Sequence, residues 1–187
     1  MDVTRILEAD HRQVEDLLSK IERAEGAART PLIEELSTSL KGHMELEEQV
    51  VYPAFQRVVG REDIEGGTTE HELARKALAD VERLAPDDPG FGGALEALKA
   101  GIDHHVKDEE EDTFPKVRKE GESALAEVAT PFMTKRLELG LPMEAPALAA
   151  ASTKEELVQE AKNVGVDGAS SMTKDELAEA LAGAMSG

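Results

Sequence analysis

HMELEEQVVYP, residues 43–53, is the stretch that decides the fold, and a second copy, HVKDEEEDTFP, occupies residues 105–115. In each copy a glutamate follows the histidine by four places, a second glutamate comes next, and an aromatic residue precedes a closing proline. One further histidine stands before each copy, His11 before the first and His71 before the second. The chain therefore repeats the order His, then His-x3-Glu, and each half is about as long as a helical hairpin.

The four histidines fall on the apolar sides of the helices that the sequence predicts. Residues four apart share one face of an α-helix, so each His-x3-Glu pair directs its imidazole and its carboxylate the same way. At about 100° per residue, His43 lies in line with Leu40. In the same way His105 lies in line with Ile102. The apolar side of an amphipathic helix faces the core, so we expect six side chains to point inward. They are His11, His43, Glu47, His71, His105 and Glu109.

Two carboxylates among these inward side chains favour a bound metal. An ionised carboxylate without a partner in an apolar interior costs several kcal/mol, and no Lys or Arg shares these stripes near the acids. Four imidazoles and two carboxylates suit a transition metal, and they are too many for one tetrahedral zinc ion. Two metal ions that share both carboxylates fit the count. Two ferric ions would carry more charge than two glutamates cancel, so an oxo or hydroxo bridge and an open position for a small oxygen species are expected.

These motifs resemble the hemerythrin family, in the broad bacterial group named for its His-His-Glu cation-binding motifs. The likeness covers residues 1–140 and rests on four stretches, which are DHRQVEDLL around His11, HMELEEQVVYP from His43, EHELAR around His71 and HHVKDEEEDTFP with His105 and Glu109. Members of that family are four-helix bundles with a non-haem di-iron centre. The resemblance therefore implies an all-α, up-down-up-down bundle in which the six inward residues hold two iron ions (Fe2+/Fe3+).

The chain departs from the oxygen-carrying hemerythrins at two positions. Those proteins have a second histidine four places after the third-helix histidine, where this chain has Arg75. Their last carboxylate is an Asp five places from its histidine, whereas Glu109 is four places from His105. The resemblance thus implies fewer protein ligands for one iron, which favours peroxide or NO chemistry or iron sensing over oxygen storage. A ferritin-like site is disfavoured because its Glu-x2-His order is not found here.

Four residues around the expected ligands have two interpretations each. Tyr52 lies away from His43 on an ideal helix and so reads as packing, but a bend at Pro53 leaves a tyrosinate ligand open. Arg75 reads as a surface salt-bridge residue or as a group that stabilises a bound anion. Asp112 and Thr113 are expected either to orient a histidine or to line an access path.

Three other acidic residues and one histidine are expected to lie outside the set of metal ligands. Glu48 and Glu110 are expected to face water or the helix flank, with a place behind a ligand as the alternative. His104 is expected at the surface or behind a ligand. Glu72 closes a capping box that begins at Thr69, and whether it touches a metal stays open.

Composition narrows the class of protein. The chain has 187 residues and a net charge of −19, which opposes binding to nucleic acid or anionic membranes. It has no cysteine, hence neither a disulfide framework nor a thiolate metal site. No stretch approaches the roughly 20 apolar residues that span a bilayer, and no signal peptide is visible. We therefore expect a cytoplasmic protein.

The order of elements can be predicted from caps and breakers. A bundle is expected over residues 1–138, with loops at Gly26, at Gly60 to Gly67 and at Pro86 to Gly90. Thr30 is expected to cap the second helix, and Thr69 the third. Residues 121–139 look helical again, with an interruption at Pro131, and are expected across the bundle end. The expected bundle helices are residues 3–24, 30–59, 69–85 and 91–119.

The composition changes after the bundle. Residues 139–152 are rich in Ala and Pro and read as a linker. Residues 153–187 contain two capping boxes, at Thr153 and Thr173, around an extended loop. This order resembles the helix–extended loop–helix module at the N-terminus of the Rho termination factor and its SAP-like relatives. Three lysines against seven acids, without arginine or aromatic residues, favour a docking or stabilising appendage, with a protein partner, over nucleic-acid binding.

Three functions from different classes remain open. The first is a module that binds a small oxygen-type ligand (O2, NO or peroxide) for sensing, storage or oxidative and nitrosative stress response. The second is a catalase-like enzyme that disproportionates hydrogen peroxide. The third is an iron or oxygen sensor that is read out through residues 153–187.

Overall fold

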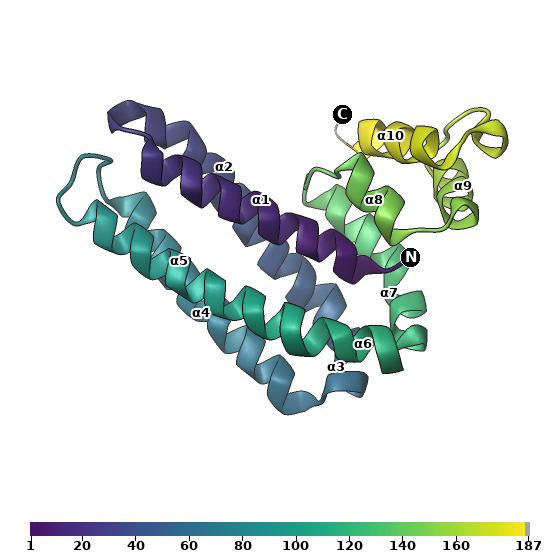
Figure 1. Cartoon of the computed structure of the whole chain (residues 1–187), viewed down its shortest axis with the longest axis horizontal. Helices are drawn as coiled ribbons and strands as arrows, with labels where there is room; N and C mark the ends of the chain where they lie inside the picture. Colours follow the sequence, from purple (N-terminus) through teal and green to yellow (C-terminus); the bar gives the residue numbers. More distant parts are fainter. Residues whose placement is uncertain (186–187) are drawn as a thin grey trace.

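Helices are the only regular elements in this computed structural model, which describes residues 1–185 of the chain. Four long helices build a bundle, and consecutive ones run in opposite directions (Figure 1). They are α1 (Val3–Arg23), α2 (Arg29–Leu46), α4 (Arg61–Arg83) and α5 (Phe91–Asp108). Helix α1 packs against α2 and α5, and α4 packs against the same two helices, so the four close a ring. The predicted all-α four-helix bundle is confirmed.

A wide helical turn follows α2, and another follows α5. Residues Glu47–Val51 and Glu109–Thr113 form π-helical turns, each of which leads directly into a short helix. These helices are α3 (Tyr52–Val59) and α6 (Phe114–Glu120). Pro53 and Pro115 stand in their first turns. A proline has no N–H and its ring clashes with the preceding helical turn, and the extra residue of a π turn relieves that clash. The bend predicted at Pro53 takes this form.

The start of α4 differs from the prediction. We expected a loop up to the pair Gly66–Gly67 and a capping box at Thr69, but α4 begins at Arg61 and passes through both glycines. The Thr69 hydroxyl donates a hydrogen bond of 2.8 Å to the Glu65 carbonyl inside the helix. The capping box is therefore absent, and Glu72 is an exposed residue in the middle of the helix.

Two glycines explain why the helix starts early. Gly60 has φ 109°, a left-handed conformation that favours glycine, and turns the chain from α3 straight into α4. Gly67 lies against Tyr52, and a Cβ there would come within 2.7 Å of the tyrosine hydroxyl. A glycine inside a helix costs about 1 kcal/mol relative to alanine, and this close contact of α4 with α3 offsets that cost. His71 consequently lies well inside α4.

Two further boundaries were predicted wrongly. Helix α2 begins at Arg29, one residue before the expected cap at Thr30, and no side chain caps it. Helix α7 (Glu122–Glu138) runs through Pro131 without the expected interruption. It packs against α3 and α6 at the end of the bundle, as expected.

The segment expected to be a linker contains a helix, α8 (Ala145–Ala151). Leu148 is fully buried, and the Asp2 amide donates a hydrogen bond of 2.6 Å to the Ala151 carbonyl. Helix α8 packs against both α1 and α10. Two helices follow it, and the capping box at Thr153 is present. The loop between them contains a 3-10 turn, Ala169–Ser171, where an extended loop was predicted. The two helices are α9 (Lys154–Asn163) and α10 (Lys174–Met185). Figure 1 shows α8 to α10 as a lobe beside the start of α1.

The apolar core consists of two clusters with a polar layer between them. One cluster lies towards the loop end of the bundle and includes Leu18, Leu36 and Leu98. The other includes Phe55 and Phe114 and continues without a break into α7 to α10. The inward-facing histidines lie between the two clusters along each helix. The structure thus fixes this polar layer from both sides with close-packed apolar side chains.

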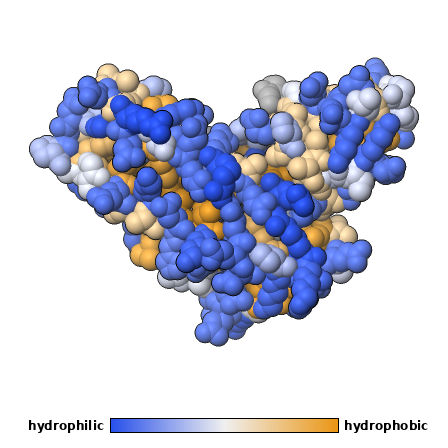
Figure 2. All heavy atoms as spheres, viewed as in Figure 1, coloured by the Kyte–Doolittle hydropathy of each residue, from blue (hydrophilic) through white to orange (hydrophobic). Residues whose placement is uncertain are grey.

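The surface is mostly polar. Figure 2 shows hydrophilic side chains over most of the visible face, with hydrophobic atoms gathered mainly between neighbouring helices. Within residues 1–185, none of the helices has both the length and the hydropathy to cross a bilayer.

Candidate metal centre

Each of the four bundle helices supplies one inward histidine, and each π turn supplies one glutamate. The two glutamates, Glu47 and Glu109, are the first residues of their π turns. All six predicted residues are buried, none more than 8% exposed. The structure brings them together in the polar layer: His11, His43, Glu47, His71, His105 and Glu109.

The glutamates lie between two pairs of histidines. The ring centroids are 4.9 Å apart in the pair of His11 and His43, and 4.6 Å apart in the pair of His71 and His105. Glu47 reaches from one pair to the other, because its Oε2 atom is 3.3 Å from His43 Nε2 and 3.1 Å from His71 Nε2.

Glu109 makes the matching connection between the other two histidines. Its Oε2 atom is 3.5 Å from His11 Nε2 and 3.7 Å from His105 Nε2. Both carboxylates therefore bridge the two imidazole pairs.

The centre leaves polar atoms without hydrogen-bond partners. Six buried side-chain nitrogen or oxygen atoms among the described residues have no partner, and five belong to the centre. They are Nε2 of His11, Nε2 of His43, both carboxylate oxygens of Glu47 and Oε2 of Glu109. Buried polar groups are nearly always paired, and leaving them unpaired is costly. Converging imidazole nitrogens and carboxylate oxygens are the donor set of a transition-metal site, so these residues fit a metal.

A ring of carboxylates holds the outer nitrogens of the four histidines. Each histidine presents Nδ1 to an acid from a neighbouring helix or π turn, which directs Nε2 to the centre. The contacts are Asp10 with His43 at 3.4 Å, Glu48 with His71 at 2.9 Å, Glu70 with His105 at 3.0 Å and Glu110 with His11 at 2.8 Å. The acids come from α1, the first π turn, α4 and the second π turn, so the ring closes around the bundle.

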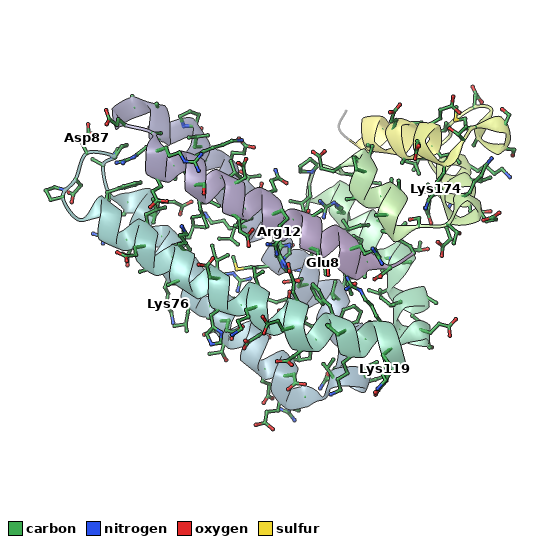
Figure 3. The ribbon with its side chains drawn as sticks, in the orientation of Figure 1. Glu8, Arg12, Lys76, Asp87, Lys119 and Lys174 are labelled. Carbon is green, nitrogen blue, oxygen red and sulfur yellow. The ribbon has the colours of Figure 1, made fainter. Side chains whose placement is uncertain are left out.

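Arginines support three of these four acids. Arg75 donates hydrogen bonds of 2.9 and 2.8 Å to Glu48. It thereby holds the carboxylate that contacts His71 Nδ1. Arg12, which Figure 3 shows on α1, forms an ion pair with Glu110. Arg136 of α7 pairs with Asp10. Glu48 and Glu110 are half-buried, and of the two interpretations weighed above the structure favours the one in which they stand behind a ligand. An acid next to each ligand in the sequence was the available signal for these residues.

Tyr52 also belongs to the centre. Its hydroxyl donates a hydrogen bond of 3.1 Å to Glu109 Oε1 and lies 3.2 Å from His71 Nε2. An ideal α-helix would turn Tyr52 away, but the extra residue of the π turn rotates it inward. Burial and the nearby charge of Glu47 raise the pKa of this phenol, so it is neutral and protonated at ordinary pH.

Asp112 and Thr113 line a surface pocket of about 480 Å³ beside the centre. Tyr52 and Glu109 line the same pocket, so it reaches from solvent to two residues of the polar layer. Within residues 1–185, neither Asp112 nor Thr113 forms a hydrogen bond or ion pair with a histidine, and their place in the pocket lining favours the access-path interpretation.

The charges of the centre favour protonated imidazoles when no cation is bound. Burial opposes the imidazolium form of His43, but Glu47 and Asp10 outweigh it and raise its pKa to about 10. Burial likewise opposes the charged form of His105, and Glu109 and Glu47 raise its pKa well above the usual value. Burial works against ionisation of Glu47, but His43 and its neighbours lower the pKa of that carboxyl well below the usual value. Protons thus occupy the place that a cation would take.

The helical bundle and its buried cluster of histidines and glutamates together indicate a metal-binding protein. The model of the hemerythrin HHE cation-binding domain matches residues 2–117. The chain therefore belongs to the hemerythrin HHE cation-binding domain family.

Two curated proteins are similar to this chain. A DNA nickase from Nostoc sp. is 23% identical over 119 residues, which are 63% of this chain and 34% of that protein. An uncharacterized hemerythrin-like protein from Schizosaccharomyces pombe is 28% identical over 124 residues, which are 63% of this chain and 61% of that protein. The chain thus spans about a third and about three fifths of their lengths. No solved structure matches it with comparable significance.

Proposed function

We propose that the chain is a non-haem di-iron protein whose centre binds a small oxygen-type ligand, O2, NO or peroxide. One observation carries the proposal. Five buried donor atoms without partners converge where two carboxylates bridge two imidazole pairs. One ion near His11 and His43 and another near His71 and His105 would satisfy all of them, with Glu47 and Glu109 shared. When bound, the iron pair would supply redox chemistry and open coordination positions.

The donor types support iron. Imidazole and carboxylate groups suit iron among the transition metals, and the chain has no thiolate to offer a softer metal. Each ion would receive two imidazoles and a share of two carboxylates, which leaves an octahedral ion short of ligands. That shortage is the reason to expect an exchangeable small ligand.

A small cavity next to the histidines supports the size of that ligand. Its volume is about 20 Å³, and all four histidines line it together with apolar side chains such as Leu40, Met44 and Ala74. A space that holds one water-sized molecule needs about 10–15 Å³ on the same measure. The apolar wall suits an uncharged diatomic molecule better than a hydrated ion.

A catalase-like activity is the second candidate, and Tyr52 favours it. Cleavage of an O–O bond needs a proton at the departing oxygen, and a positioned side chain can supply one. The Tyr52 hydroxyl lies inside the centre, bonded to Glu109, and keeps its proton because its pKa is raised. This tyrosine would hold a proton beside the bound peroxide and take it back from solvent through the neighbouring pocket.

Metal analysis tests the main proposal. Protein purified without added metal should contain two iron ions per chain, and its visible absorption should change when the anaerobically reduced protein meets O2 or NO. A chain with one ion, or with two ions and no spectral response, would contradict it. Oxygen release from added peroxide, above the rate with free iron, would favour the second candidate.

The charge of −19 leads us to expect no binding to DNA, which a mobility-shift assay checks.

A further inference from the structure

The pocket beside Tyr52 is strongly acidic. It lies between the first half of α4 and the π turn that joins α5 to α6, and we name it the acidic pocket. Six of its lining side chains are carboxylates: Glu62, Asp63, Glu70, Asp108, Glu109 and Asp112. Lys116 is the one basic residue of the lining, and it donates its own hydrogen bond of 2.9 Å to the Val59 carbonyl. The pocket therefore attracts cations and repels anions.

The floor of the acidic pocket is part of the buried centre. Glu109 lines the pocket, is 5% exposed, and has a carboxylate oxygen without a hydrogen-bond partner. Tyr52, 4% exposed, stands beside it and bonds to it. A cation that passes Tyr52 would meet Glu109 first, and that residue belongs to the centre.

A group of possible metal ligands stands at the rim. Glu70, His104 and Asp108 hold one possible ligand atom each within 4.8 Å of one another. His104 Nδ1 lies 3.3 Å from Asp108 Oδ1, and His104 Nε2 lies 3.9 Å from Glu70 Oε1. Glu70 and Asp108 also line the acidic pocket, and Glu70 touches His105 of the centre. Two residues of the rim group thus line the same pocket as Glu109.

We propose that the acidic pocket is the uptake path by which a divalent transition-metal ion reaches the buried centre. The rim group of Glu70, His104 and Asp108 captures the hydrated ion. The remaining carboxylates draw it inward, and Glu109 receives it beside Tyr52. The proposal rests on the proposed metal centre, and it adds the route and the residues that load it. Two of the three ligands, His104 and Asp108, are exposed, which suits capture because the ion must leave them again.

Packing explains why the path opens here. Gly66 and Gly67 line the pocket without a side chain, and an added Cβ at Gly67 would come within 2.7 Å of the Tyr52 hydroxyl. Apolar clusters cover the centre towards both ends of the bundle. The acidic pocket is lined by Tyr52 and Glu109 together, which gives an ion polar contacts on its way inward.

Stopped-flow uptake of Co²⁺ by the metal-free full-length chain tests the path, because bound cobalt is seen by its visible absorption. The variant H104Q/D108N/D112N removes two negative charges and the rim histidine, all at exposed positions. Its uptake should be about tenfold slower than that of the wild type, since attraction by a charged cleft changes association rates by tenfold or more. The final number of bound ions should not change.

A matched control separates the pocket from the net charge of the chain. The variant E34Q/E35Q also removes two negative charges, from exposed positions on α2 far from the acidic pocket, and it should take up cobalt at nearly the wild-type rate. Equal rates for the two variants would overturn the uptake path and leave the metal centre standing. Failure of the wild type to bind cobalt at equilibrium would overturn both proposals.

Discussion

Arg136 donates hydrogen bonds of 2.7 and 2.6 Å to the two carboxylate oxygens of Asp10, a residue 126 positions earlier in the chain. Asp10 in turn lies 3.4 Å from His43 Nδ1. Arg136 also donates a hydrogen bond of 3.1 Å to the Pro142 carbonyl, at the start of the connection to α8. It belongs to α7, beyond the matched domain of residues 2–117. A residue outside that domain thus supports one histidine of the centre.

Replacing Arg136 with Gln should weaken both the fold and one half of the centre. The change leaves the carboxylate of Asp10 buried without its cation, and breaking a buried pair in this way costs about 3–5 kcal/mol of unfolding free energy. Metal affinity near His43 should fall by about tenfold or more, as for other residues that orient a ligand. Urea unfolding of the metal-free protein and a metal titration measure the two effects. The exposed Arg57, paired with Glu127, offers R57Q as a control with little effect on either. Equal behaviour of the two variants would contradict this role of Arg136.

Replacing Glu47 with Gln should remove one bridge between the imidazole pairs. The amide keeps the volume but loses the charge, so we expect fewer than two iron ions per chain after reconstitution. Metal analysis by mass spectrometry measures the number. The same change at the half-buried Glu45, which pairs with Lys135 on the outside of α2, is the control and should leave two ions bound. Full iron content in E47Q would count strongly against a shared carboxylate.

Tyr52→Phe should separate iron binding from peroxide chemistry. The variant loses the hydroxyl hydrogen bond to Glu109 but keeps the ring, which stacks on His71 with centroids 5.4 Å apart. We expect unchanged iron content and a rate of peroxide consumption at least about tenfold lower, a typical effect of removing a proton donor. An oxygen electrode measures this rate. A variant as fast as the wild type would exclude Tyr52 as the source of the proton.

The protons of the metal-free centre set the pH dependence of metal binding. The pKa of His43 is raised to about 10, so its stabilising charge is fully present below about pH 6.5, the unfolded value, and is lost as the pH rises through about 10. The metal-free fold should therefore lose stability across this window. Metal ligands must be neutral imidazoles, so affinity should rise over the same window and binding should release protons. Calorimetry at pH 8 in two buffers of different ionisation enthalpy measures that release. Equal heats in both buffers would rule it out.

Ending the chain after residue 142 tests whether the C-terminal helices stabilise the bundle. A second measurement, on the full chain, tests whether residues 153–187 respond to iron binding at the centre. The truncation removes α8 to α10, which share an apolar cluster with α1. We expect a melting temperature lower by about 4 °C or more, since a loss of each kcal/mol shifts it by about 2–4 °C in a domain of this size. If the tail is a readout, iron should change the protease sensitivity of α8 to α10 in the full chain. Identical digestion with and without iron would leave these helices as a stabilising appendage.

The sequence predicted the inward residues but not their supports. His43 and Glu47 could be placed because helical periodicity is local, and a histidine on an apolar stripe faces the core whatever the rest of the fold does. The place of Tyr52 stayed open because a π turn cannot be recognised from an ideal helical wheel. The early start of α4 was not predicted because it depends on a contact between two helices. The packing of Gly67 against Tyr52 offsets the free-energy cost of placing glycines inside a helix, and a local sequence pattern does not show that contact.

The outer acids could not be assigned for a related reason. Each stands directly beside a predicted ligand in the sequence, as Asp10 stands beside His11, but it serves a histidine on a different helix. Their partners depend on how the helices are arranged around the bundle axis, which the sequence pattern leaves undetermined. The pairing of Arg136 with Asp10 could not be predicted for the same reason, because the two residues lie even further apart along the chain.

The closed ring of carboxylates has a consequence for how the bundle can move. Every helix of the ring both holds a histidine and, directly or through its π turn, steadies the histidine of a neighbour. If one helix rotated about its own axis, the Nε2 atom of its histidine would turn away from the centre. The same rotation would pull its carboxylate away from the Nδ1 atom of the neighbouring histidine. The rotational settings of the four helices are therefore interlocked, and distortion at any one of them is passed around the whole circumference.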